Sequence, residues 1–211
     1  MARPREFDTD HALESAMQLF WSKGFEATSL DDLCSVTGLS RSSLYAAFGS
    51  KKKLLLQTVK RYSEQRTPNI EAVLAQHVPI RAAFASLASR FIDDIVAGPG
   101  RRGCYLGNCA AELPRHERAT LAKVREGLAG TEAVFRAALA EARSRGELDR
   151  NADVQALARY LTAAFQGLRL VGKVNPDRNA LNDIANTMLK CLDDTQTAAA
   201  VRRKSTQGKK S

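Results

Sequence analysis

The chain has 211 residues and a net charge of +9, and 44% of its residues are hydrophobic. No apolar run approaches the roughly 20 residues that a transmembrane helix needs, so the sequence excludes a helical membrane protein and supports a globular core. The positive charge favours a polyanionic partner, although a basic surface without a partner explains it equally well. Few runs of β-branched residues are present, which predicts an all-α protein.

The four cysteines do not have the spacing of zinc ligands. We interpret them as reduced thiols, which are typical of cytoplasmic proteins. The N-terminus, Met-Ala-Arg-Pro-Arg-Glu, has no apolar signal core, and this also predicts a cytoplasmic location. No motif for a cofactor or a metal ion is recognisable, so we expect neither.

The chain opens with a short basic stretch and a helix. Residues 1–7 carry Arg3 and Arg5, and they are either an arm that touches DNA phosphates or filler without a role. The segment from Asp8 to Lys23 predicts a helix, because its acidic residues lie early, where the helix dipole favours negative charge. Its apolar residues share one side at helical spacing. Gly24 is expected to end this helix.

The stretch from Ser29 to Phe48 predicts two short helices joined by a tight turn. Ser29 is followed three residues later by Asp32, which is the pattern of a capping box. Gly38 is expected to end the first helix, because glycine adopts a left-handed backbone at little steric cost. The second helix then begins after Ser40, which is a good N-cap residue.

The second helix of this pair has one apolar stripe, formed by Leu44 and Phe48. Its other faces carry small, hydroxylated or cationic residues: Arg41, Ser42, Ser43, Tyr45 and Ala46. A short helix with this surface fits the major groove of DNA, where hydroxyl and guanidinium groups reach phosphates and base edges.

A further helix begins at Lys51 and breaks a local rule. Lys51, Lys52 and Lys53 lie in its first turn, where the helix dipole disfavours cations. Because a helix N-terminus attracts anions, lysines beside it predict a phosphate clamp, with an accidental run of solvated charge as the alternative. Residues 1–66 hold ten Lys/Arg and eight Asp/Glu, a net charge of only +2. We therefore expect the acids, Asp31 among them, to lie away from the DNA face.

The range from about Glu6 to Arg66 resembles the N-terminal DNA-binding domain of the TetR/AcrR family of bacterial regulators. The order and spacing of the motifs match throughout this range. The residues that carry the resemblance are Leu19-Phe20, Gly24-Phe25, Thr28-Ser29-Leu30, Gly38-Leu39-Ser40, Ser43-Leu44-Tyr45, Phe48, Ser50-Lys51 and Leu54. The resemblance implies a three-helix helix-turn-helix domain over 1–66 and a ligand-binding and dimerisation bundle over 67–195. The remaining residues, 196–211, are basic and contain no acid, which predicts a disordered tail.

The resemblance also implies roles for single residues. Thr28 would cap toward a phosphate, and Lys51 would hold the DNA backbone. The implied DNA-binding residues are Thr28, Ser29, Ser40, Arg41, Ser42, Ser43, Tyr45, Ala46, Lys51 and Lys52. Three positions depart from the family pattern: Ser42 replaces Gly or Ala, Ala47 replaces a larger polar or aromatic residue, and Lys52 replaces an acid. Lys52 should strengthen the attraction to the DNA backbone.

The rest of the chain predicts further helices over 80–96, 104–113, 116–146, 153–174 and 177–192, with a turn at 101–103. Thr67-Pro68 is expected to mark a boundary, after which 69–77 is a short helix or the continuation of a bent one. The last two helices have more apolar surface than one small bundle can hide, which predicts a homodimer through them. The alternative is a monomer with a larger core.

In this family the C-terminal helices form a ligand pocket, and ligand binding spreads the two DNA-binding heads. The candidate ligand or sensor residues in this chain are Cys104, Asn108, Phe91, Phe165 and Lys173. The segment 103–113 resembles a branch of the family in which a cysteine follows a glycine, and some members of that group sense electrophiles or oxidants. Cys104 would lie at a helix N-terminus behind Arg101 and Arg102, which favours a reactive thiol. A buried packing residue is the alternative.

These features together predict a cytoplasmic, homodimeric repressor that a small-molecule or electrophile inducer releases from double-stranded operator DNA. A non-specific architectural DNA-binding protein, which uses the lysines and the basic tail from Ala198, is the alternative. A helical enzyme is a third hypothesis. The three histidines of the chain are isolated, and the chain has no carboxylate pair, nucleophile elbow or phosphate loop. We therefore expect no enzymatic activity.

Overall fold

The computed structural model describes residues 9–114 and 117–193, so the predicted N-terminal arm, His116 and the basic tail lie outside the described residues. Every regular element within these two ranges is a helix, which confirms the predicted all-α class. None of the described helices is long and apolar enough to cross a membrane. The chain divides into two compact units, Met1–Gln65 with Tyr105–Gly127, and Arg66–Cys104 with Leu128–Ser211.

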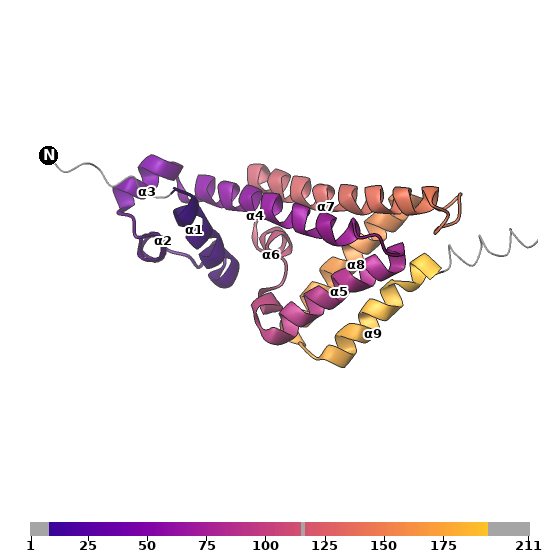
Figure 1. The fold of residues 1–211 in the computed structure, drawn as a ribbon. Coiled ribbons are helices and arrows are strands. Elements are labelled where there is room, and N and C mark those ends of the chain that lie inside the picture. The colour runs from indigo at the N-terminus through magenta and orange to yellow at the C-terminus, as the bar shows by residue number, and fades with distance from the viewer. Residues whose placement is uncertain (1–8, 115–116, 194–211) are drawn as a thin grey trace, which may run out of the picture. The chain divides into compact units, whose positions relative to one another are not determined.

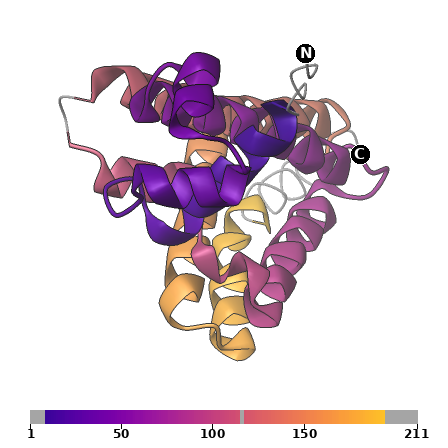
Figure 2. The ribbon, with the colours of Figure 1, turned by 90° about the vertical axis from the view of Figure 1, so that its left-hand side faces the viewer.

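Three helices open the first unit: α1 (Thr9–Lys23), α2 (Leu30–Thr37) and α3 (Arg41–Phe48). Figures 1 and 2 show them from two directions. Ser29 caps α2 in the predicted capping box with Asp32, and Ser40 Oγ accepts a hydrogen bond from the Ser43 backbone N–H at the start of α3. Gly38 has φ +69°, the left-handed conformation in which a helix ends readily. The boundaries predicted for this helical pair are therefore confirmed.

The next helix, α4 (Lys51–Leu74), starts at the predicted residue but runs through Pro68. The expected boundary at Thr67-Pro68 is therefore wrong as a helix end, and of the two predicted alternatives the continuation is correct as far as Leu74. Pro68 and Glu64 are both exposed, so the Glu64 carbonyl, which loses its N–H partner to the proline, can bond to water. The two units divide inside this helix, between Gln65 and Arg66.

Two elements from later in the chain complete the first unit: α6 (Tyr105–Glu112) and the first part of α7 (Arg118–Ser144). Tyr105 is 1% exposed, and its ring centroid lies 5.5 Å from that of Tyr62 and 6.0 Å from that of Trp21. Its hydroxyl oxygen lies 2.8 Å from Thr58 Oγ1. Burial raises the pKa of Tyr105 far above its usual range, so the phenol stays neutral. Tyr105 thus ties α6 to α1 and α4.

The second unit adds four elements to the remaining parts of α4 and α7: α5 (Ile80–Ala97), the 3₁₀ turn η1 (Pro99–Arg102), α8 (Val154–Val174) and α9 (Arg178–Met188). Helices α5, α8 and α9 pack on one another, as Figure 1 shows. The ring centroid of Phe135 lies 5.0 Å from that of Phe84 and 5.6 Å from that of Phe165 in the middle of the core. Asp153 and Asp177 cap α8 and α9, at the predicted starts of these helices.

Two glycines of α7 allow a matched test of how closely its neighbours pack. A Cβ atom on Gly127 would lie 2.8 Å from Leu106 Cδ1 and closer still to Ser63 Oγ, whereas Gly130 has no neighbour nearer than 3.9 Å. We expect Gly127→Ala to lower the free energy of unfolding by about 1–3 kcal/mol, because these neighbours would have to move. Gly130→Ala should raise it by about 0.5–1 kcal/mol, because alanine favours the helix. Denaturant unfolding measures both, and equal effects would contradict the close approach at Gly127.

Candidate nucleic-acid interface

Helix α3 exposes the surface that the sequence assigned to DNA. Leu44 and Phe48 are 1% and 3% exposed, and they hold the helix against the first unit. The outward residues Arg41, Ser42, Tyr45 and Ala46 are exposed, and Ser43 is half-buried. Tyr45 keeps 42% of its surface exposed, so its side chain is accessible to a partner.

Three serine hydroxyls gather at the N-terminus of α3. Ser40 Oγ lies 2.9 Å from Ser42 Oγ and 2.9 Å from Ser43 Oγ. The N-terminus of a helix carries a partial positive charge, which favours an anion nearby. Because hydroxyl groups can turn to donate outward, this cluster is suited to a phosphate oxygen.

The exposed residue Ser29 takes part in a smaller network at the start of α2. Ser29 Oγ donates to Asp32 Oδ2 at 2.8 Å and accepts from the Asp32 backbone N–H at 3.1 Å. Lys23 Nζ also donates to Asp32 Oδ2, at 2.5 Å. The hydrogen bond from Lys23, followed by those from Ser29, holds the pKa of Asp32 well below its usual range. The hydroxyl of Ser29 therefore serves the helix cap in this structure.

The expectation that Asp31 lies away from the DNA face is wrong. Arg41 Nη2 donates to both carboxylate oxygens of Asp31, at 2.7 Å and 2.9 Å, and Arg41 Nε donates to Oδ1 at 3.1 Å. The tight turn brings the first turn of α2 beside the first turn of α3, so that opposite charges attract. The pair is exposed, with 62% of the Arg41 side chain and 76% of the Asp31 side chain accessible. Arg41 can thus bind a DNA phosphate only if its guanidinium leaves the Asp31 carboxylate or contacts both groups at once.

Thr28 is also placed differently from its expected role at a phosphate. It is 1% exposed, and its hydroxyl donates to the Gly24 carbonyl at 2.5 Å. Gly24 itself has φ +88°, a left-handed backbone conformation that allows the chain to turn after α1. The Thr28 side chain therefore closes the turn between α1 and α2, and its hydroxyl is not part of the exposed surface.

The three lysines at the start of α4 differ in their surroundings. Lys51 Nζ lies 4.3 Å from the centre of the Phe25 ring, a cation–π contact. Lys52 forms an ion pair with Glu117, so an acid offsets its charge. Lys53 is exposed and has no ion pair with any described residue. Lys53 is therefore the lysine of this turn that is best placed to attract a phosphate, although the predicted DNA-binding residues included Lys51 and Lys52 instead.

Of the predicted ligand or sensor residues, Phe91 is the one among the residues that line the described cavity. This cavity has a volume of about 310 Å³ and lies in the second unit. The ring centroid of the buried Phe165 lies 5.5 Å from that of Phe91, but Phe165 is not among the residues that line the cavity. Asn108 belongs to the first unit, and Lys173 is exposed near the end of α8. Cys104 directly precedes α6, as expected, but it is only 6% exposed. Burial opposes the reactivity that a sensor needs, and it favours the alternative of a packing residue.

Arg169 is a buried charge that the sequence reasoning missed. Its side chain is carried by α8, its Nη2 donates to the Gly103 carbonyl at 2.9 Å, and its guanidinium carbon lies 5.3 Å from the centre of the Phe91 ring. A cation within the apolar run Leu168-Arg169-Leu170 was the available signal. The described residues hold no group of three or more His, Cys, Asp or Glu side chains arranged for a metal ion.

Two family profiles match the chain. The family described as "Bacterial regulatory proteins, tetR family" matches residues 12–58, which include the helix-turn-helix. The family described as "Tetracyclin repressor-like, C-terminal domain" matches residues 82–188, from α5 into α9.

Two bacterial proteins are similar to the chain over nearly its whole length. The uncharacterized HTH-type transcriptional regulator YezE of Bacillus subtilis is 31% identical over 194 residues, which cover 92% of this chain and 100% of YezE. The HTH-type transcriptional repressor ComR of Escherichia coli is 31% identical over 191 residues, which cover 89% of this chain and 90% of ComR.

A solved structure of similar fold contains DNA. It is a cysteine mutant of the TetR family transcriptional regulator CifR, complexed with 26-bp double-strand operator DNA. The TM-score is 0.81 at 28% sequence identity, and the match covers 89% of this chain and 98% of that one. The resemblance seen in the sequence is thereby confirmed, and the chain belongs to the TetR family of bacterial regulatory proteins.

Proposed function

We propose that the chain is a homodimeric transcriptional repressor that binds operator DNA through α3 and leaves it when a small molecule binds the second unit. The outward surface of α3 carries this proposal, because it combines an exposed tyrosine, a cluster of serine hydroxyls and an arginine on a helix of groove-fitting size. ComR is named a repressor, and CifR is complexed with operator DNA. Both relatives support the same role for this chain.

The exposed face of α8 supports dimerisation. It carries a stripe of exposed residues without a single charge: Ala156, Tyr160, Ala163, Gly167, Leu170, Val171 and Val174. Leu170 and Val174 are 65% and 81% exposed, which is unfavourable for apolar side chains in water. The steps of three and four residues place the stripe on one side of the helix. A second copy of α8, related by a twofold axis, would cover it.

A twofold dimer explains how two copies of α3 read one operator. Recognition helices of such dimers lie about 34–36 Å apart, which is one turn of DNA. A ligand releases the operator only if it binds better to an arrangement with another spacing, since equal affinity for both arrangements shifts nothing. The proposed repressor therefore needs a ligand site and no catalytic chemistry.

The alternative function is non-specific architectural binding of DNA. Such binding rests on cations that neutralise phosphates, and the basic tail proposed to supply them lies outside the described residues. The middle of the exposed α3 surface consists instead of the uncharged residues Ser42, Tyr45 and Ala46. Because these uncharged side chains cannot neutralise phosphates, this composition favours a regulator that binds through short-range contacts over a binder that rests on charge alone.

Tyr45→Ala tests whether α3 reads bases. We expect it to weaken binding to operator DNA from upstream of its own coding sequence by about 1–3 kcal/mol, and to leave binding to random DNA nearly unchanged. Lys53→Ala should weaken both and lower the magnitude of the salt slope by about 1.8, the effect of one phosphate contact in each of the two subunits. Lys60→Ala, an exposed lysine of the same helix, is the matched control and should change neither.

Fluorescence anisotropy at several salt concentrations measures these affinities. The absence of any preference for operator over random DNA would reject the repressor. If removal of residues 198–211 abolishes binding while Tyr45→Ala has no effect, the architectural alternative is correct.

Asp31→Asn tests the restraint on Arg41. The substitution removes a carboxylate from the surface and frees the guanidinium in each subunit, so binding to all DNA should tighten and the salt slope of the dimer should steepen by about 1.8. Glu64→Gln makes the same change of charge on α4, where Glu64 pairs with Lys60, and should leave the slope unchanged. A loss of operator preference with unchanged binding to random DNA would contradict the restraint and show that Asp31 orients Arg41.

Ala163→Asp tests the dimer interface on α8. A carboxylate in the middle of the uncharged stripe would be buried by the partner subunit without a counter-charge, so we expect the dimer to dissociate and operator affinity to fall at least about tenfold. Ala137→Asp places the same carboxylate at an exposed position of α7 beside Arg136, and it should leave the dimer intact. Analytical ultracentrifugation gives the mass of each variant. A stable Ala163→Asp dimer would exclude this interface.

A further inference from the structure

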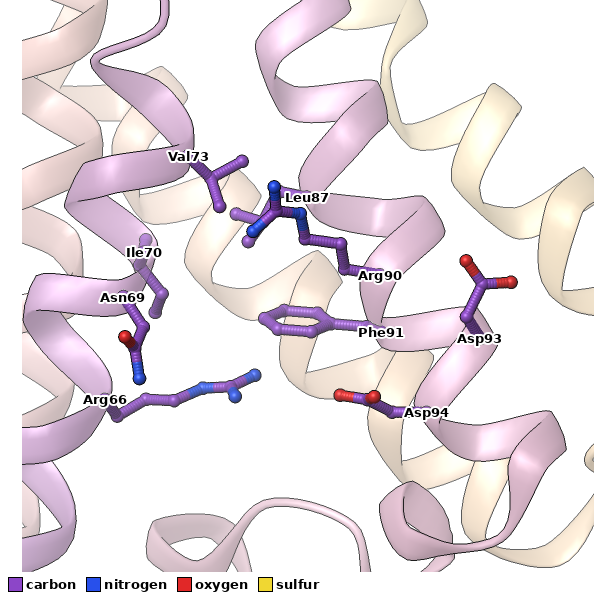
Figure 3. A pocket seen from close by; sticks show the side chains of 9 residues that line it. All are labelled: Arg66, Asn69, Ile70, Val73, Leu87, Arg90, Phe91, Asp93 and Asp94. Atoms are coloured by element: carbon purple, nitrogen blue, oxygen red, sulfur yellow. The ribbon is translucent and has the colours of Figure 1, made fainter.

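The cavity in the second unit lies between two helices. It has a volume of about 310 Å³ and is lined by the second part of α4 and the middle of α5. Figure 3 shows the lining side chains that converge on it from these two helices. At the roughly 30 Å³ that a water molecule occupies in the liquid, the cavity has room for about ten waters or a ligand with about as many non-hydrogen atoms.

The floor of the cavity is apolar. Ile70 and Val73 of α4 and Leu87 and Phe91 of α5 line it, and each of them is at most 7% exposed. Such a surface gains free energy when the apolar body of a ligand covers it.

Two guanidinium groups border this floor. The Arg66 guanidinium lies 4.3 Å from the centre of the Phe91 ring, and in Figure 3 that ring lies between the side chains of Arg66 and Arg90. Arg90 is exposed and has no hydrogen bond or ion pair within the described part of the chain. The N–H edges of the Arg90 guanidinium are therefore open to an acceptor, and a carboxylate fits those edges best.

The acids at the cavity do not cancel this charge. Asp93 is already paired with Arg178 across 2.7 Å, which leaves Asp94 as the carboxylate without an ion pair among the lining residues. Three arginines, Arg66, Arg90 and Arg178, stand against these two acids, so the formal charge at the cavity is positive. Arg169, 5.3 Å from the Phe91 ring, adds to it. A cationic ligand would be attracted to the face of the Phe91 ring, but the Arg66 guanidinium already lies over that ring.

We propose that this cavity binds an organic monoanion with an apolar body, of the class of the aryl-alkyl carboxylates. The apolar part lies on the floor formed by Ile70, Val73, Leu87 and Phe91, and the carboxylate is held at the Arg90 end. Asp94 disfavours a second negative charge at the other end. The inference rests on the proposed function, because such a molecule would be the inducer.

A set of three probes of nearly equal size and different charge tests the ligand class. These are 3-phenylpropanoate, its neutral amide and 3-phenylpropylamine, titrated into the full chain in a calorimeter without DNA. We expect the carboxylate to bind at least about tenfold more tightly than the amide or the amine, the difference that one charge-assisted hydrogen bond provides.

Variants of the chain assign that preference to Arg90. Arg90→Gln should remove most of the preference for the carboxylate, and Arg90→Lys should restore part of it. The exposed position of Arg90 leaves the fold unaffected by either change. Arg136→Gln, the same substitution at an exposed arginine of α7, is the control and should leave all three affinities unchanged.

The possible outcomes separate this inference from the proposed function. Stronger binding of the amide or amine, no saturable binding of the carboxylate at a Kd of about 1 mM or below, or an unchanged preference in Arg90→Gln would overturn the ligand class. Each of these results is independent of DNA. Loss of operator preference in the anisotropy assay would instead overturn the repressor, whatever the calorimeter shows.

Discussion

The burial of Leu44 and Phe48 is the constraint on which the DNA-facing surface depends. Helix α3 has eight residues, and isolated helices shorter than about 12–15 residues are marginal in water. Its outward side carries serines, an alanine and an exposed tyrosine, which add little packing of their own. The helix therefore persists because its two inward side chains are 1% and 3% exposed and because Ser40 caps its first turn. The outward residues of α3 are thus free to serve recognition because the inward residues Leu44 and Phe48 fix the helix by packing.

Local signals were sufficient to place α2 and α3, because caps and left-handed glycines act within a few residues. Ser29, Gly38 and Ser40 were each expected in the roles that they have. The pairing of Arg41 with Asp31 was not foreseen, since it depends on how two helices meet across the turn. Lys52 pairs with an acid 65 residues away, and no local pattern encodes such a distance. The exposed surface was thus predictable as a set of residues, while the state of each charge within it was not.

The first unit is incomplete without α6, a helix that the sequence placed with the C-terminal bundle. Tyr105 fills the space beside Trp21 and Tyr62, and its hydroxyl meets Thr58. At the other end of α6, Glu112 Oε1 accepts a hydrogen bond from the Glu26 backbone N–H at 2.8 Å, in the turn that precedes α2. A single short helix therefore contacts α1, α4 and the turn that precedes α2. Neither contact could be deduced from the sequence, because both join segments far apart along the chain.

The path of the chain from the cavity to α6 offers a route by which the proposed ligand would act on DNA binding. Helix α5 lines the cavity and is followed directly by η1, where Arg101 Nε donates to the Ile95 carbonyl at 3.3 Å and the Gly103 carbonyl accepts from Arg169. The next residues are Cys104 and Tyr105, the latter anchored in the first unit. A ligand that changes the spacing of α4 and α5 would therefore act on a connection anchored at both ends. Its effect on DNA affinity is limited to the difference between its affinities for the two arrangements.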